Sequence, residues 1–427
     1  MPDTVWLGID LGTSGCRVIA INQQESVVFE KHSQFTGQTY PTPTEQWQFV
    51  YQLLKDAVDT LQNTDISAIA VDATSGSVLV CDVNGEPLTE MLLYNDSIAN
   101  DYNQQISSFA PKESAAIGAG SGLAKLLYLQ SYHQITSPHY LVHQADWINM
   151  QLGSDVGITD YNNALKSGFD IENQCWPDWI ASITSQQHLP KVVAPGTPIG
   201  KMSETLMQLL GLAQKTPPKI IAGTTDSMAA FIATGVSKLG EAVSSIGSTL
   251  VLKMITDKPV FSAGLGVYSH KLGDLWLVGG ASNTGGAVLK SFFTTEQITA
   301  LSHQIDVKQT PPDYYPLIEI GERFPVADPE KQAVLTPRPE RDSLFLHGIF
   351  KGIANIEKAG YDKLQLLTGT TPTSIRTVGG GAQNPVWTTI RQHILNIPFA
   401  NASHTQAAFG AALLAKNGLN NFEVNRG

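Results

Sequence analysis

The chain has 427 residues, of which 42% are hydrophobic and 15% charged, and its formal net charge at pH 7 is −11. This composition excludes a disordered chain, and the length predicts about two to three globular domains. The negative charge, with no cluster of lysine and arginine, argues against a nucleic-acid-binding protein and favours a small-molecule partner.

The first half of the chain begins as an α/β domain. Apolar runs separated by turn residues predict strands, and a stripe of apolar residues at helical spacing predicts a helix. An Asn84-Gly85 pair after a further apolar run is a strong hairpin signal. The elements expected before that turn are strands at residues 6–9, 16–21 and 25–30, a helix at 46–62 and a strand at 66–73.

The turn of the first hairpin, DLGTSG, has two interpretations. In one, Asp10 holds a hydrated Mg²⁺ while turn amides and the hydroxyls of Thr13 and Ser14 bind phosphate oxygens. In the other, Gly12 and Gly15 supply positive φ angles for a tight turn, and Asp10 only accepts hydrogen bonds from turn amides. The residues alone leave both open.

The pattern starts again near residue 220. Residues 219–236 predict a strand, a polar turn and a helix, and residues 241–255 predict a second hairpin. Its turn, IGST, is similar to the LGTS of the first hairpin, which indicates either a chance likeness or an internal repeat of two α/β domains with a cleft between them.

The remaining elements predict a long irregular segment between helices. Residues 310–341 are rich in proline and exclude regular helix or central sheet. A helix is expected at 343–360, and a strand, glycine loop and helix at 374–395. Small residues in 405–418 predict a closely packed final helix.

Targeting and redox signals are absent from the sequence. The N-terminus lacks a signal-like pattern, and no apolar run approaches about 18 residues. The cysteines Cys16, Cys81 and Cys175 show neither a disulfide framework nor metal-ligand spacing, so we expect buried free thiols. We therefore expect a cytoplasmic protein.

Taken in order, the motifs resemble those of the FGGY family of carbohydrate kinases over nearly the whole chain. The resemblance implies an α/β fold with two ribonuclease H-like domains of the actin, hexokinase and Hsp70 superfold and an interdomain cleft. It further implies a sugar-binding domain at residues 1–222 and a nucleotide-binding domain at 223–427. The matching segments are GIDLGTSG, LLYND, DYNNALKSGFD, AGTTDSMAA, SIGST, GERFP, VGGGAQNPVW and AAFGAALLA.

The resemblance also implies roles for residues of the first hairpin and of the AGTTDSMAA segment. Asp226 matches the aspartate that takes a proton from the sugar hydroxyl, although an aspartate at this place could also cap the following helix. Asp10 matches the aspartate that positions Mg²⁺, and Gly12, Thr13 and Ser14 lie in the loop that meets the transferred phosphate.

Nucleotide contacts are implied in the second half. Ser248 and Thr249 match a second phosphate-binding turn, and Gly380, Gly381 and Asn384 match an adenosine-binding loop. The alternatives are a hairpin turn with exposed hydroxyls and a strand-to-helix turn with asparagine as the cap. No Walker A or protein kinase motif is present in the sequence.

Sugar contacts are expected from two further segments. The candidates are Thr74, Ser75 and Gly76, together with Asn95, Asp96 and the two catalytic aspartates. Better-known xylulose and glycerol kinases usually carry a glutamine near position 74, so the hydroxyl-rich sequence here resembles the compact D-ribulose kinase branch more closely.

The sequence therefore predicts an ATP-dependent kinase that uses Mg²⁺ and phosphorylates the primary hydroxyl of a ketopentose, D-ribulose first. A D-xylulose kinase is the alternative substrate assignment. An alternative of another class is a nucleotide-driven binding protein of the actin and Hsp70 kind, with no sugar acceptor. The expected partners are a small sugar and ATP, without nucleic acid or membrane.

Overall fold

A computed structural model describes residues 3–36, 40–118 and 120–422. Contacts between residues divide the chain into two compact units, which we call the first unit, Met1–Gly235 with Gln406–Glu423, and the second unit, Val236–Thr405 with Val424–Gly427. The domain boundary expected between residues 222 and 223 lies inside strand β10 (Lys219–Thr225). The division comes later because helix α7 (Asp226–Ala233) packs on helix α12 (Ala407–Asn417), which belongs to the first unit.

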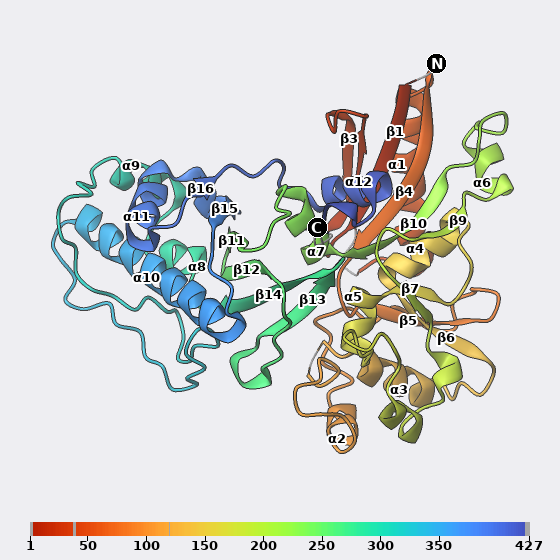
Figure 1. The fold of residues 1–427 in the computed structure, drawn as a ribbon, viewed down its shortest axis with the longest axis horizontal. Helices are drawn as coiled ribbons and strands as arrows, with labels where there is room; N and C mark the ends of the chain where they lie inside the picture. The colour runs from red at the N-terminus through yellow and green to blue at the C-terminus, as the bar shows by residue number, and fades with distance from the viewer. Residues whose placement is uncertain (1–2, 37–39, 119, 423–427) are drawn as a thin grey trace. The chain divides into compact units, whose positions relative to one another are not determined.

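The first unit is built on a six-stranded sheet with the order β3-β2-β1-β4-β10-β9 (Figure 1). Strands β1, β4 and β10 are parallel, whereas β2, β3 and β9 pair antiparallel with their neighbours. The predicted hairpin and the strands that follow it are confirmed. The other bounds are β1 Asp3–Leu11, β2 Gly15–Ile21, β3 Val27–Gln34, β4 Thr64–Ala73 and β9 Pro198–Lys201.

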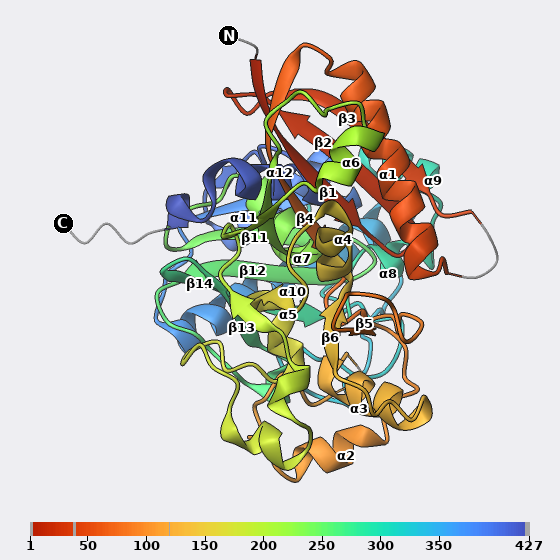
Figure 2. The ribbon, with the colours of Figure 1, turned by 90° about the vertical axis from the view of Figure 1, so that its right-hand side faces the viewer.

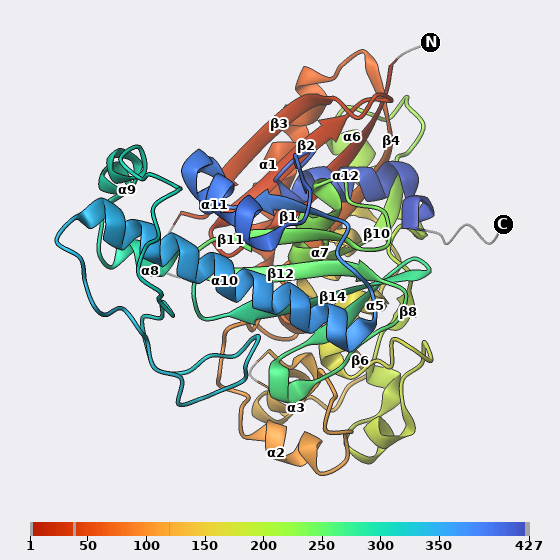
Figure 3. The same cartoon turned by 60° about the vertical axis from the view of Figure 1, so that its left-hand side comes forward.

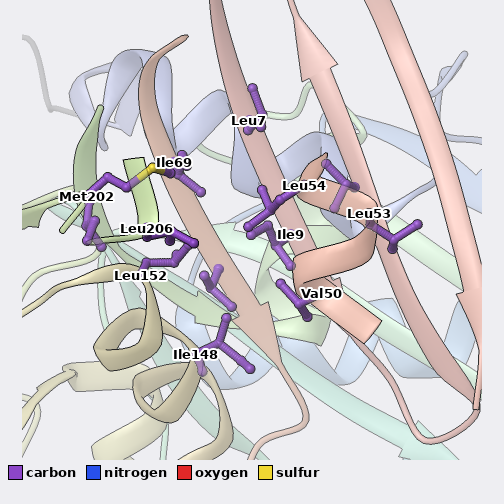
Figure 4. Packing of buried hydrophobic residues seen from close by; sticks show 14 of the residues in the cluster. Leu7, Ile9, Val50, Leu53, Leu54, Ile69, Ile148, Leu152, Met202 and Leu206 are labelled. Carbon is purple, nitrogen blue, oxygen red and sulfur yellow. The ribbon is translucent and has the colours of Figure 1, made fainter. Parts of the chain in front are cut away.

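Helices cover both faces of this sheet because side chains alternate along its strands. Leu7 and Ile9 of β1 point into a core formed with helices α1 (Pro43–Thr60) and α4 (Gln144–Leu152), as Figure 4 shows. Gly8 lies on the other face, where a Cβ would stand 1.9 Å from the Ala408 carbonyl oxygen of α12. Glycine is therefore required for this close approach.

A smaller subregion of the first unit lies beyond the sheet (Figure 2). Its strand β5 (Val78–Asp82) pairs with β6 (His139–His143). The predicted turn forms, with φ of 89° at Gly85, but the chain after it returns to β5 only through single bridges. The remaining elements of the first unit are α2 Tyr102–Ser107, α3 Gly122–Tyr132, β7 Ile158–Asp160, α5 Tyr161–Ala164, β8 Lys191–Val193 and α6 Glu204–Leu209. Of these, α6 packs on the core of the six-stranded sheet through Leu206 and Met207.

The second unit has its own six-stranded sheet, with the order β13-β14-β12-β11-β15-β16. Strand β11 is antiparallel to β12 and parallel to β15, which repeats the relation of β1 to β2 and β4. The internal repeat is thus present in the topology of the sheets. The bounds are β11 Glu241–Ile246, β12 Leu250–Thr256, β13 Tyr268–Leu272, β14 Leu275–Ser282, β15 Ser374–Val378 and β16 Phe399–Ala400.

Helix α10 (Asp342–Thr368) runs along β12 and β14 in the second unit (Figure 3). It also packs against helix α11 (Pro385–Leu395) and α9 (Thr295–Ser302), while α8 (Gly286–Lys290) is short. The proline-rich segment 310–341 contains no regular helix or strand, as predicted.

A buried ion pair connects these helices. Arg391 of α11 donates to both carboxylate oxygens of Glu357 of α10, at 2.6 and 2.7 Å, and both side chains are fully buried. Ser244 of β11 also donates to Glu357, and Arg391 donates to Thr377 Oγ1 of β15 at 3.0 Å. The pair therefore joins two helices to two strands through charge-assisted hydrogen bonds.

Two further expectations can be compared with the structure. Cys16 and Cys81 are buried free thiols, but Cys175 is exposed, so that expectation is wrong for the third cysteine. No helix in the described part of the chain combines the length and apolar character that a membrane crossing requires.

Candidate active site

Three aspartates lie at the carboxyl ends of neighbouring parallel strands in the first unit. Asp10 of β1 and Asp72 of β4 are paired in register, and Asp226 directly follows β10. The carboxyl ends of parallel strands share one edge of a sheet, so the three carboxylates gather there. The charge of Asp226 raises the pKa of both Asp10 and Asp72.

Burial changes the ionisation of Asp10 and Asp72. Burial, followed by the charge of Asp226, raises the pKa of Asp10 to about 6, although Asp72 and Arg17 partly offset this. Burial, followed by the charges of Asp10 and Asp226, holds the pKa of Asp72 well above its ordinary value of 3.8.

The aspartate pair fits a hard cation such as Mg²⁺. Within the described residues, no donor reaches either carboxylate oxygen of the fully buried Asp72. Unpaired oxygens beside a second carboxylate are what Mg²⁺ prefers as ligands. No group of three or more His, Cys, Asp or Glu in the described part of the chain is arranged to hold a metal. Water and phosphate would therefore complete the coordination, as is usual for Mg²⁺.

Replacing Asp72 by asparagine should stabilise the protein at pH 8 in the absence of metal and nucleotide. Because the pKa of Asp72 is higher in the folded protein than its ordinary value of 3.8, protonated Asp72 favours the folded state. This contribution to the free energy of unfolding is complete below pH 3.8 and is lost as the pH rises through the pKa of Asp72 in the folded protein. Asparagine has nearly the same shape and cannot ionise. Thermal unfolding of the wild type and of Asp72→Asn at pH 4 and pH 8 tests this. The unfolding temperature of the variant should be clearly above that of the wild type at pH 8, and the difference should be smaller at pH 4. A loss of equal size at both values would contradict it.

The turn after β1 presents hydroxyl groups beside Asp10. Gly12 N donates to Gly15 O at 2.9 Å, and Thr13 and Ser14 are exposed between them. The expectation of positive φ at the two glycines is wrong, since neither has one. Gly15 is required for another reason: a Cβ there would stand 2.2 Å from Ser33 O of β3.

Asp226 begins helix α7 without being its N-cap. Thr225 holds the cap position, and Asp226 is the first helical residue, with Oδ1 accepting from Ser227 N at 2.6 Å. The alternative that Asp226 is the N-cap of the following helix is therefore wrong, because the cap is the residue before it. The carboxylate is half-buried, at the sheet edge where a general base would meet a bound alcohol.

In the loop after β4, one hydroxyl is hydrogen-bonded to other side chains and another is buried without a bond among the described residues. Thr74 is buried, and its hydroxyl donates to Gln144 Oε1 at 2.7 Å and lies 2.6 Å from Ser77 Oγ. The hydroxyl oxygen of Ser75 is buried without a hydrogen-bond partner among the described residues. Gly76 has φ of 90°, and a Cβ there would stand 2.5 Å from Gly120 O.

A second loop contacts the first. Tyr94 N donates to Ser77 Oγ at 3.0 Å, which brings residues 93–96 against residues 74–77. Asp96 shapes its own loop by accepting from Leu93 N at 2.6 Å, and Asn95 is exposed. The predicted sugar-binding segments thus lie together in one unit, with residues 78–92 between them in the sequence.

A cavity of about 600 Å³ lies within the second unit. Four of the predicted nucleotide residues line it, Ser248, Gly380, Gly381 and Asn384, whereas Thr249 lies in the same turn but is not among the lining residues. A Cβ on Gly381 would stand 2.5 Å from Ile246 Cγ2, so glycine is needed at this wall. The volume suits a nucleoside, since small-molecule sites measure about 300–1,000 Å³.

Asn384 has a structural role in this cavity. Its side chain caps α11 by accepting from Trp387 N at 3.0 Å, and its amide donates to Ser302 Oγ at 2.7 Å. The capping alternative is therefore present in the structure. A nucleoside that contacted the Asn384 side chain would have to share its amide oxygen with Trp387 N or its amide nitrogen with Ser302 Oγ.

Two family descriptions match the chain in succession. The N-terminal domain of the FGGY family of carbohydrate kinases matches residues 5–233, and the C-terminal domain of the same family matches residues 242–417. The chain belongs to this family. The predicted resemblance is confirmed, and so is the activity class: the protein is a carbohydrate kinase.

Relatives of this kinase agree with the assignment. It is 23% identical to the xylulose kinase of Staphylococcus epidermidis, with 99% of this chain and 90% of the relative covered. It is 22% identical to the gluconokinase of Bacillus subtilis, with 96% and 86% covered.

Solved structures show the same fold. A xylulose kinase from Rhodospirillum rubrum superposes with a TM-score of 0.83 at 19% identity, covering 97% of this chain and 90% of the other. The glycerol kinase of Plasmodium falciparum with ADP superposes with a TM-score of 0.84 at 17% identity, covering 99% of this chain and 91% of the other. The α/β fold with two ribonuclease H-like domains is therefore confirmed.

Asp72 was not among the residues predicted for the active site of this kinase. A signal was available, because Asp72 interrupts the otherwise apolar strand sequence AIAVDA and a lone carboxylate in such a run needs an explanation. The bonding of Thr74 to Gln144 could not be foreseen, since the two residues meet only through the pairing of β5 with β6.

Proposed function

We propose that this kinase transfers a phosphoryl group from ATP to the primary hydroxyl of a ketopentose, D-ribulose first. The observation that carries the proposal is the cluster of Asp10, Asp72 and Asp226, with the hydroxyl-bearing loop 74–77 beginning two residues after Asp72. The cluster provides a proton acceptor and cation ligands in the same unit as groups that can bind a polyol.

Each residue has a distinct task in the proposed reaction. Asp226 accepts the proton of the sugar hydroxyl as the hydroxyl oxygen attacks phosphorus. Asp10 and Asp72 would hold Mg²⁺, which when bound reduces the negative charge on the phosphates. The exposed hydroxyls of Thr13 and Ser14 bind phosphate oxygens, and Gly12 closes the turn that presents them through the bond from its amide to Gly15 O.

The second unit would hold the nucleotide. The Gly380-Gly381 backbone borders the nucleoside in the 600 Å³ cavity, and Asn384 keeps the wall of that cavity in place. Ser248 and Thr249 are exposed in the β11–β12 turn and would contact phosphates. This division of tasks matches the resemblance from which the residues were predicted.

The choice of sugar rests on the 74–77 and 93–96 loops. Ser75, with its unpaired hydroxyl, and Asn95 and Asp96 supply donors and acceptors for sugar hydroxyls, which favours a polyhydroxylated ketose. D-Xylulose is the second candidate, because several of the relatives are named xylulose kinase. Relatives named as carbohydrate kinases favour a sugar acceptor over a nucleotide-driven binding protein without one.

A coupled ADP-release assay with ATP and Mg²⁺ tests the proposal. The acceptors are D-ribulose, D-xylulose, L-ribulose, gluconate, glycerol and none. We expect D-ribulose to give the highest kcat/KM. A preference for D-xylulose would change the substrate and keep the roles of the aspartates, whereas no ketopentose response would contradict the proposal.

A further inference from the structure

Lys125 is buried in the first unit, and no carboxylate among the residues that the structure describes is bonded to it. It lies one turn into helix α3, its side chain is 0% exposed, and its ammonium donates to Gly76 O at 2.7 Å and to Leu93 O. Removing an ammonium from water is costly unless strong hydrogen bonds compensate. An apolar residue would fill this place without the free-energy cost of removing a charge from water. A lysine here therefore suggests that its two hydrogen bonds have a function.

The two carbonyl groups belong to different loops. Gly76 is in the loop 74–77, and Leu93 begins the loop 93–96. We call these two loops the paired loops. Ser77 adds a second connection, through the bond from Tyr94 N. Gly76 also lies against Gly120 O, just before α3. Lys125 therefore fixes the distance between the paired loops from a rigid helix.

The amine stays charged near neutral pH. The pKa of Lys125 is lowered to about 8, mainly by burial; the charge of Asp96 opposes this decrease, and the charge of Lys166 adds to it. Lys166 itself lies over the same region, donating to Ser75 O at 3.3 Å. Charged donors form stronger hydrogen bonds than neutral ones, so the paired loops are held firmly at pH 7.

We propose that Lys125 is a positioning residue that sets the affinity and selectivity for the sugar by holding the paired loops in register. This inference rests on the proposed function, because it requires the paired loops to bind the acceptor. Lys125 does not touch the sugar; both of its bonds are to backbone carbonyls. Small misplacements of substrate-binding groups have large effects, which makes such a connection worth its desolvation cost.

Steady-state kinetics of three variants test the role. Lys125→Met removes the ammonium with a side chain of similar length, and Ser77→Ala removes the second connection. Lys215→Met is the matched control, because Lys215 also donates to two backbone carbonyls, Gln62 O and Thr64 O, at the far end of β4. The KM for D-ribulose and D-xylulose, the KM for ATP, kcat and the unfolding temperature are measured for each.

Loss of two charge-assisted bonds should raise the ketopentose KM of Lys125→Met by about tenfold or more, with the KM for ATP little changed. The ratio of kcat/KM between the two ketoses should also fall. Ser77→Ala should show the same pattern more weakly, and Lys215→Met should keep the wild-type KM for both ketoses, KM for ATP and kcat.

The outcomes separate the two proposals. A wild-type protein that does not respond to any ketopentose contradicts the proposed function. A responsive wild type whose sugar KM is unchanged in Lys125→Met overturns the positioning role, as does an equal rise in the KM for ATP. If Lys125→Met does not fold, Ser77→Ala decides, and an unchanged sugar KM in that variant also overturns the role.

Discussion

Replacing Asp226 by asparagine should lower sugar-dependent turnover by about 10²- to 10⁴-fold, the usual contribution of a general base. The amide keeps the size of the side chain and can still accept the bond from Ser227 N, so helix α7 should begin as before. It cannot accept the proton of the attacking hydroxyl. The loss should therefore appear in kcat, with the unfolding temperature and the affinity for nucleotide little changed.

Asp101→Asn is the matched control for this variant. Asp101 lies in the same unit at the start of α2, is exposed, and makes no capping bond with its side chain. It should retain full turnover in the ADP-release assay. Full turnover by Asp226→Asn itself would mean that another group takes the proton, and it would remove Asp226 from the proposed mechanism.

Replacing Arg391 by methionine should cost about 3–5 kcal/mol of unfolding free energy, because it leaves the buried carboxylate of Glu357 without its partner. Both side chains are fully buried, and Glu357 would keep only the hydrogen bond from Ser244 among those described here. The effect should fall on the second unit, where all of these residues lie.

Urea unfolding followed by spectroscopy measures the loss. Lys358→Met on the same helix is the control, since its ion pair with Asp362 is exposed and should be worth about 1 kcal/mol or less. The double variant Arg391→Met/Glu357→Leu should recover much of the loss, because the stranded charge is then gone. Equal costs for Arg391→Met and Lys358→Met would show that the buried pair adds no more than an exposed one.

Local pattern was sufficient to predict much of the fold. The hairpin that carries Asp10, the strand before Asp226 and the irregular segment 310–341 all follow from apolar periodicity, turn residues and proline. The extent of the first unit could not be read in this way. Helix α12 belongs there because Gly8 and Gly410 allow close backbone approach, and such contacts join positions far apart in sequence.

The site was predicted unevenly for a similar reason. Asp10 and Asp226 stand in turn-like segments where a carboxylate is noticeable, but the pairing of Asp72 with Asp10 depends on which strands become neighbours. The demand for glycine at position 15 arises from β3, not from the turn itself. Sequence indicates residue types at chain reversals, whereas contacts between distant segments decide what those residues do.

The return of α12 to the first unit has a consequence for synthesis on the ribosome. Residues 236–405 of the second unit are continuous and can pack as soon as they emerge. The sheet of the first unit is made earlier, yet the face that carries Gly8 stays uncovered until the helix 407–417 has been translated. The nascent chain therefore carries an exposed apolar sheet face through most of its translation, and this face is where a chaperone would be expected to bind.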